Sequence, residues 1–160
     1  QEKNAAYNLL PYKALPPASM TQLKTYGKQG GALLLSGSYL GTDTKSEEER
    51  LFMDEMLGVR APGRVANDTL EGVWGMNTPI ELYNQPNATH YFVQHTDVLE
   101  PTKSTAFSVF SYGKGGFSAG VANAEDMQRS ITLGFPFECI KDETLRKYVM
   151  QGVLKYLLKK

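Results

Sequence analysis

Residues 30–38 read Gly-Gly-Ala-Leu-Leu-Leu-Ser-Gly-Ser, and this stretch decides the fold class. A continuous apolar run bounded by glycines favours a strand that is covered on both faces, as in sheets with helices on either side. The two glycines before the run end a preceding helix, and Ser-Gly-Ser turns the chain at the carboxyl end of the strand. We therefore predict a buried central strand over residues 32–35, followed by a sharp turn.

Helical patterns lie on both sides of this strand, over residues 20–26, 47–57 and 143–157. Each combines apolar positions at helical spacing with a side chain that can cap the first turn. The expected capping residues are Ser19 with Gln22, Ser46 with Glu49, and Asp142. These patterns place at least one helix before the strand and two after it.

The chain between residues 64 and 135 has the composition of a sheet, because Val, Ile, Phe and Tyr dominate short runs that Gly or Asn separate. The expected strands are residues 64–66, 72–75, 80–83, 91–94, 106–112, 118–122 and 130–134. Residues 5–10 have a weaker strand pattern. Residues 113–116, Gly-Lys-Gly-Gly, are expected to join two antiparallel strands. The order of elements predicts one layered α/β domain over residues 1–160, with a mixed sheet and flanking helices.

Composition excludes several functional classes. The 160 residues are 41% hydrophobic, enough for one sizeable core. Seventeen Lys and Arg balance seventeen Asp and Glu, so the basic surface that binds nucleic acid is missing. No apolar run approaches the roughly 20 residues of a membrane span. Cys139 is the only cysteine, which excludes an intrachain disulfide and a cysteine-based zinc cluster. We expect no cofactor and no metal.

Several segments resemble parts of a known fold. They are Leu23 to Gly37 (Leu-Lys-Thr-Tyr-Gly-Lys-Gln-Gly-Gly-Ala-Leu-Leu-Leu-Ser-Gly), Ile131 to Glu138 (Ile-Thr-Leu-Gly-Phe-Pro-Phe-Glu), Tyr12 to Pro16, Ser36 to Tyr39, and Arg146 with Met150. The first two resemble class I glutamine-amidotransferase-like domains, which have a flavodoxin-like fold. Together the segments resemble secreted Bacteroides-type proteins named xanthan lyases. The resemblance covers nearly the whole chain after residue 12.

The resemblance implies a secreted or periplasmic parent protein, a polysaccharide ligand, and βα elements upstream of Gln1 that this chain lacks. In amidotransferases a cysteine occupies the turn after the strand, and a His-Pro-Glu motif supplies the base. Here the turn holds serines, and residues 135–138 read Phe-Pro-Phe-Glu. The resemblance therefore implies a non-catalytic binding or scaffolding domain linked to polysaccharide or cell-envelope processing.

The alternative function is a carbohydrate lyase, or an amide or ester hydrolase, that uses a serine in the sharp turn after residues 32–35, called the elbow below. The candidate catalytic residues are Ser36, Ser38, His95 and Asp97. A serine becomes nucleophilic only beside a base, and a His-x-Asp pair can supply an oriented imidazole. The structural interpretation of the same residues is a small turn residue at the elbow and a polar pair at the end of a strand.

Four more residues are candidates for ligand binding: Tyr39, Trp74, Glu138 and Arg146. Tyr39 leads away from the elbow. The Trp74 ring either stacks on a sugar or packs partly buried among the strands. Glu138 is expected at the end of a central strand, where it either meets a ligand or forms an ion pair with Arg146 on the closing helix.

The missing upstream elements predict a sheet that ends at an unpaired edge strand. Such an edge is a template for another chain, so we expect a homo-oligomer or pairing with the upstream segment of the parent protein. The alternative is a monomer in which residues 11–18 fold over the edge.

Overall fold

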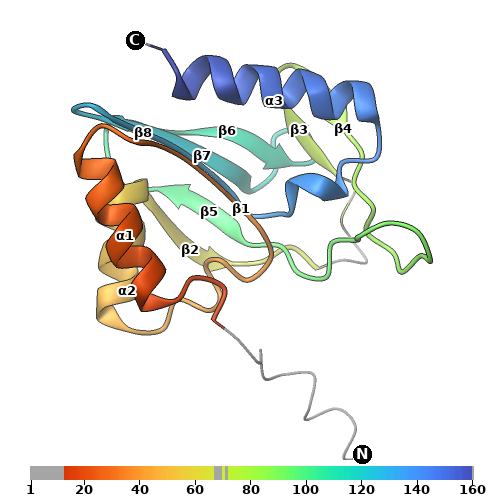
Figure 1. The fold of residues 1–160 in the computed structure, drawn as a ribbon. Helices are drawn as coiled ribbons and strands as arrows, with labels where there is room; N and C mark the ends of the chain where they lie inside the picture. The colour runs from red at the N-terminus through yellow and green to blue at the C-terminus, as the bar shows by residue number, and fades with distance from the viewer. Residues whose placement is uncertain (1–12, 67–69, 71, 160) are drawn as a thin grey trace, which may run out of the picture.

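The computed structural model describes residues 13–66, 70 and 72–159, whose backbone forms a mixed sheet between layers of helices (Figure 1). The helical elements are α1 (Pro17–Lys28), α2 (Glu47–Phe52), its π-helical continuation η3 (Met53–Leu57), the 3-10 turn η5 (Phe137–Cys139) and α3 (Glu143–Leu157). The strands are β1 (Ala32–Ser36), β2 (Val59–Gly63), β3 (Val73–Gly75), β4 (Thr78–Ile80), β5 (Val98–Pro101), β6 (Ala106–Tyr112), β7 (Ser118–Glu125) and β8 (Gln128–Leu133). The strand pattern in residues 5–10 lies outside the described residues.

Six strands form the main sheet in the order β1-β8-β7-β6-β3-β4. β1 runs parallel to β8, and the other neighbours are antiparallel. β2 and β5 form a separate antiparallel pair. Among the described helices, none is long and apolar enough to cross a bilayer. The predicted mixed sheet with flanking helices is confirmed.

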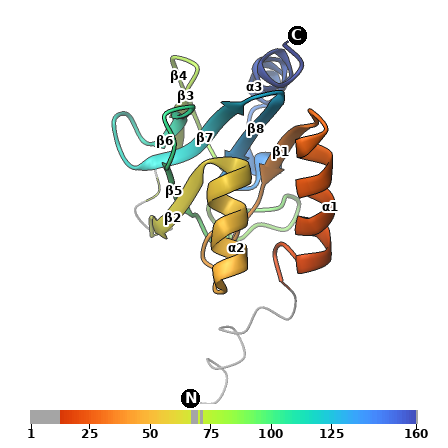
Figure 2. The same ribbon diagram turned by 90° about the vertical axis from the view of Figure 1, so that its left-hand side faces the viewer.

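Helices and the β2–β5 pair cover the two faces of the main sheet (Figures 1 and 2), and an apolar core lies on each face. On one face, α3 buries Val149 and Val153 against Ile131 and Phe135. On the other face, α1, α2, η3 and the β2–β5 pair form a second core. Its fully or largely buried members are Met20, Leu33, Phe52, Met53, Met56, Leu57, Val59, Leu99 and Val121. The sheet is thus sandwiched, which is what its alternating side chains require.

The predicted strand at residues 32–35 exists, but it lies at the edge of the sheet rather than at its centre. Leu33 is buried in one core, while Leu34 is half-buried against the other. A leucine run reflects the covering of the two faces and carries no information about strand order. Ser36 ends β1, as expected, and the chain leads through Tyr39 into a loop.

Most expected strands are found within a few residues of their predicted bounds. Residues 72–75, 106–112, 118–122 and 130–134 correspond to β3, β6, β7 and β8. The turn at residues 113–116 joins β6 to β7, as predicted.

Three expected strands are wrong. Residues 64–66 follow β2, whose Pro62 and Gly63 concealed it because these residues are depleted in strands. Residues 80–83 overlap β4 only at Ile80; beyond it, Leu82 makes a single bridge to Ile140. Residues 91–94 form no strand. β5 was not expected, because its last two residues are Glu and Pro.

Two of the three predicted caps are confirmed. Glu49 N donates to Ser46 Oγ over 3.1 Å and Ser46 N to Glu49 Oε2 over 2.9 Å, which completes the capping box. Lys13 and the backbone amides at the cap lower the pKa of Glu49 to about 2. Asp142 Oδ1 accepts from Leu145 N over 2.7 Å. The predicted cap at Ser19 is wrong, because α1 already begins at Pro17, a residue suited to the first helical position.

Gly58 provides a test of packing between η3 and the sheet. Its φ is 67°, and a Cβ there would lie 2.9 Å from Asn123 Cγ and 3.0 Å from Ala106 Cβ. We expect Gly58→Ala to lower the free energy of unfolding by about 2–3 kcal/mol, because strain in the left-handed conformation adds to the overpacking. Urea denaturation measures the loss.

Gly113→Ala is the matched control. Gly113 has a φ of 64°, but nothing lies within 4 Å of an added Cβ, so only the backbone cost of about 1 kcal/mol should remain. Equal losses in the two variants would contradict the role given to the contacts around Gly58.

Candidate functional site

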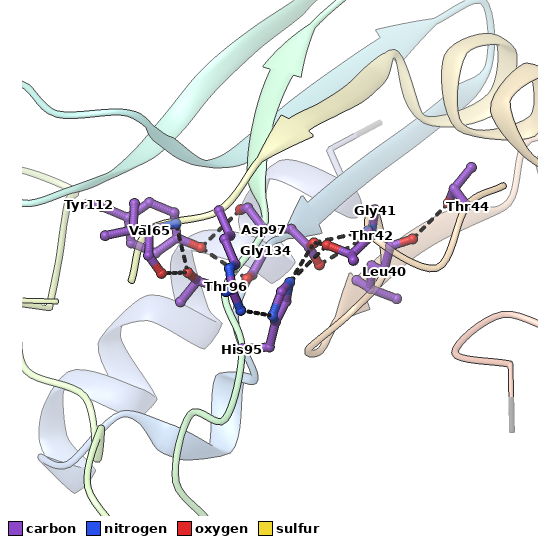
Figure 3. Close-up of polar contacts among 11 residues, drawn as sticks. Leu40, Gly41, Thr42, Thr44, Val65, His95, Thr96, Asp97, Tyr112 and Gly134 are labelled. Atoms are coloured by element: carbon purple, nitrogen blue, oxygen red, sulfur yellow. Dashed lines mark hydrogen bonds and ion pairs between the residues drawn. The ribbon is translucent and has the colours of Figure 1, made fainter. Parts of the chain in front are cut away.

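Asp97 is fully buried immediately before β5, with hydrogen-bond donors around its carboxylate (Figure 3). Oδ2 accepts from Gly41 N over 3.2 Å, and Oδ1 accepts from Thr42 N over 3.0 Å and from Thr42 Oγ1 over 2.7 Å. Burial raises the pKa of Asp97, but the hydrogen bonds from His95, Thr42 and Gly41 outweigh it and leave the pKa below its ordinary value. A buried charge therefore holds the loop that follows β1.

His95 is 4% exposed and has a polar neighbour at each ring nitrogen. Nε2 lies 2.8 Å from Thr42 Oγ1 and 3.5 Å from Asp97 Oδ1, while Nδ1 lies 3.4 Å from Nη1 of Arg64. Thr42 donates its only hydroxyl proton to Asp97, so it accepts from His95. Arg64 can only donate, so Nδ1 accepts. These bonds assign the neutral tautomer with the proton on Nε2.

Tyr39 covers the histidine from the loop side. Its ring is stacked on the His95 ring, with centroids 4.3 Å apart and planes inclined by 13°. Its φ of 66° is left-handed, a conformation that costs a non-glycine residue about 1–2 kcal/mol. The stack and the bonds from Gly41 and Thr42 to Asp97 hold the loop in this conformation.

The backbone around Asp97 extends the polar network into the main sheet. Asp97 N donates to Gly134 O over 2.7 Å, and the Tyr112 hydroxyl lies 3.0 Å from Asp97 O and 2.9 Å from Gly134 O. Burial, followed by the charge of Asp97, raises the pKa of Tyr112, which keeps its hydroxyl a donor. Thr96 Oγ1 donates to Val65 O over 2.7 Å. The network thereby joins β5, β6, β8 and the segment after β2.

The two candidate serines lie outside this network. Ser36 Oγ accepts from Phe137 N over 2.7 Å and donates to Phe135 O over 3.1 Å, so it ties the end of β1 to the turn after β8. Ser38 Oγ is shielded from solvent and makes no hydrogen bond of normal geometry to a described group. The structure brings His95 and Asp97 together and leaves both serines apart from them.

The remaining candidates are scattered. Trp74 is half-buried in β3, with Lys114 Nζ 5.1 Å from its ring centroid. Glu138 is exposed in η5 instead of ending a strand, because the chain turns at Pro136, and it forms no ion pair with Arg146. The expected tie between the closing helix and the sheet is therefore wrong. Of the four binding candidates, Tyr39 alone contacts the polar network through its ring.

Sequence reasoning missed Thr42, Arg64 and Tyr112. Thr42 follows a glycine in a polar loop, where nothing distinguishes it from an ordinary turn residue. Within the described residues, no three His, Cys, Asp or Glu side chains are grouped to hold a metal ion.

No family model matches the sequence, and no curated protein matches it. The fold resembles part of a GH42 β-galactosidase from G. stearothermophilus, with a TM-score of 0.60 and 12% identity over 88% of this chain and 20% of that one. The β-galactosidase from Rahnella sp. R3 has a TM-score of 0.57 and 13% identity, over 89% of this chain and 21% of that one. The β-galactosidase from Halorubrum lacusprofundi has a TM-score of 0.56 and 16% identity, over 88% of this chain and 20% of that one. The chain thus spans about a fifth of these proteins, and the likeness is one of fold.

Asp97→Asn tests the role of the buried carboxylate. The amide keeps the size of the side chain but places an N–H₂ group among donors, so we expect a loss of about 3 kcal/mol in the free energy of unfolding at neutral pH. Because the native pKa lies below the unfolded one, ionised Asp97 stabilises the protein above the unfolded pKa. That contribution disappears as the pH falls through the native pKa.

Urea titrations from neutral pH to below about pH 4 measure both effects. The wild type should lose stability over this range, and the Asn variant should lose less. Asp54→Asn, at a half-buried carboxylate outside the network, should change stability by no more than about 0.5 kcal/mol. An Asp97→Asn variant as stable as the wild type would refute the proposed role.

Proposed function

We propose that this chain is a non-catalytic binding or scaffolding domain within a larger carbohydrate-processing protein. One observation carries the proposal: the imidazole of His95 and the carboxylate of Asp97, the pair best suited to general-base catalysis, are already used in internal hydrogen bonds. Both ring nitrogens of His95 and both oxygens of Asp97 have partners. The occurrence of the fold within GH42 β-galactosidases supports the carbohydrate-related setting.

Catalysis requires a nucleophile and a base that reach a substrate as well as each other. Ser36 is bonded to the main chain, and His95 is enclosed by Tyr39, Thr42 and Arg64. Cys139 is buried, and burial together with the Glu138 carboxylate raises the pKa of its thiol to about 12, so a thiolate is scarce near neutral pH. These groups stabilise the fold.

We further propose a parent protein of the secreted xanthan-lyase type, with this chain as its amidotransferase-like domain. The segments after residue 12 that resemble that group support this. The Phe-Pro-Phe-Glu sequence in place of His-Pro-Glu fits a domain that has kept the fold and lost the chemistry.

Turnover assays test the absence of catalysis. With nitrophenyl glycosides, nitrophenyl esters and xanthan as substrates, we expect rates equal to those without protein, because neither serine has a base within reach. The alternative hydrolase or lyase would be established by turnover that is lost in Ser36→Ala or Ser38→Ala. The control variant Ser118→Ala, which changes a serine on β7, would keep that turnover.

We also propose that the free edge of β1 pairs with a strand from the parent protein or from a second copy. In the described residues, β8 is the only strand that pairs with β1. Lys13 and Ala14 are held by Glu49 and Asp43, so this part of the chain lies against the start of α2. An unpaired edge exposes backbone donors and acceptors in register for another strand.

Light scattering over a range of concentrations, with intact mass measurement, tests the edge. We expect a mass above that of one chain that rises with concentration, or a co-purifying peptide. A monomer that persists at every concentration, without a bound peptide, would contradict this pairing.

A further inference from the structure

A cavity of about 420 Å³ lies where α2 and its continuation η3 run beside β2, away from the His95–Asp97 pair (Figures 1 and 2). This volume is near the lower end of the range of about 300–1,000 Å³ that ligand pockets span, so it suits a small ligand. Charged residues from α2, η3 and β2 line the cavity together with four aliphatic ones. The aliphatic residues are Met53, Val59, Ala61 and Pro62.

Two irregularities of the backbone shape this cavity. The π-helical turn η3, which winds more widely than an α-helix, supplies Met53 and Asp54. β2 contains a bulge, in which Ala61 and Pro62 together correspond to the single residue Leu99 of β5. Both devices re-aim side chains, and both recur beside functional sites. The cavity is therefore built from departures from regular structure in a helix and in a strand.

The wall of the cavity is held in place before any ligand binds. Gly41, in the loop after β1, lines the cavity and is packed so closely against β2 that an added Cβ would overlap the Cβ of Ala61. Gly41 N also donates to Asp97 Oδ2 over 3.2 Å, so the buried carboxylate fixes this part of the wall. A preformed wall lowers the ordering cost of binding.

Two charged residues of the wall, Arg50 and Asp54, have no ion pair within the described part of the chain. The Arg50 guanidinium donates through Nη1 to Lys45 O over 2.7 Å, and its other N–H groups have no described partner. Asp54 is half-buried, and its carboxylate accepts no hydrogen bond from a described residue. The third charged residue, Arg60, is occupied, because its Nε and Nη2 lie 2.8 and 2.7 Å from Glu100 Oε2. The cavity thus combines one available cation, one available anion and an aliphatic lining.

We propose that this cavity binds a free α-amino acid with an aliphatic side chain. The ligand carboxylate accepts from the planar fork of the Arg50 guanidinium, and the ligand ammonium donates to the Asp54 carboxylate. The aliphatic side chain is buried against Met53, Ala61 and Pro62. A ligand with only a negative group leaves Asp54 unpaired, and one with only a positive group leaves Arg50 unpaired, so the two charges select a zwitterion. This inference goes beyond the proposed function, which assigns no ligand to the cavity.

NMR titration of the ¹⁵N-labelled chain tests the ligand, with L-leucine, L-leucinamide, N-acetyl-L-leucine and L-serine as probes. Leucine should shift amides in residues 41–44, 50–54 and 59–61. Leucinamide lacks the carboxylate and N-acetylleucine lacks the ammonium, so each should bind about tenfold more weakly, because each loses a hydrogen bond to a charged group. Serine keeps both charges but loses the apolar contact, and it too should bind about tenfold more weakly.

Two variants assign the two charges separately. Arg50→Gln should remove the preference for leucine over leucinamide, and Asp54→Asn should remove the preference for leucine over N-acetylleucine. Neither residue belongs to the buried core, so both variants should keep the wild-type pattern of amide signals. Arg146→Gln is the matched control, because Arg146 is half-buried on α3 and should leave all of these affinities unchanged.

Several outcomes would overturn the proposal. They are no shift with leucine, shifts confined to other residues, equal affinity for leucine and its two derivatives, preferences that survive in both variants, and a loss of leucine binding in Arg146→Gln as large as in Arg50→Gln. Each outcome would show that the charges of Arg50 and Asp54 do not select a zwitterion in this cavity.

Discussion

The arrangement of the loops and the sheet depends on the hydrogen bonds of Asp97. The Asp97 carboxylate holds the loop after β1 through Gly41 and Thr42, while the Asp97 backbone N–H donates to Gly134 O at the end of β8. Removing the partners of a buried charge lowers the free energy of unfolding by several kcal/mol, so the fold needs all of these hydrogen bonds at once. Gly41 also lacks room for a side chain, because an added Cβ would lie 2.0 Å from Ala61 Cβ.

His95 and Asp97 show how the components of a catalytic site can serve a structural purpose. A carboxylate that orients an imidazole is the arrangement of a hydrolytic triad, and it occurs here at 3.5 Å. The site differs from a triad in two ways: Arg64 donates a hydrogen bond to the second ring nitrogen, Nδ1, and Tyr39 is stacked on the face of the ring. The imidazole therefore joins two loops and has no free nitrogen for a substrate proton.

The sequence was sufficient for features that depend on neighbouring residues. The Ser46–Glu49 box lies within one helical turn, and the β6–β7 hairpin depends on its own glycines. Strand order depends on residues far apart, which is why the leucine run of β1 indicated a central strand although it lies at the edge. Composition also misled at residues 91–94, where Tyr, Phe and Val favoured a strand although the segment is irregular.

In the candidate site too, the contact between near neighbours in the sequence could be predicted, and the contacts between distant residues could not. His95 and Asp97 are two residues apart, so their interaction was visible as a motif. Thr42 lies 53 residues from His95, and Arg64 lies 31 residues from it, and a single sequence contains no signal for such pairs. Ser36 was placed correctly at the end of β1, but its hydrogen bonds depend on the turn after β8, about which the motif says nothing.

The parallel pairing of β1 with β8 has a consequence for the order of folding. Ala32 is paired with Arg129, so this contact closes a loop that includes most of the described chain. Contacts of such sequence separation form slowly, while the β6-β7-β8 meander needs only local closure. During synthesis from the N-terminus, the apolar residues of β1 emerge long before β8 exists. In that interval β1 lacks β8 as its partner, and a chaperone that binds short apolar segments has a binding site there.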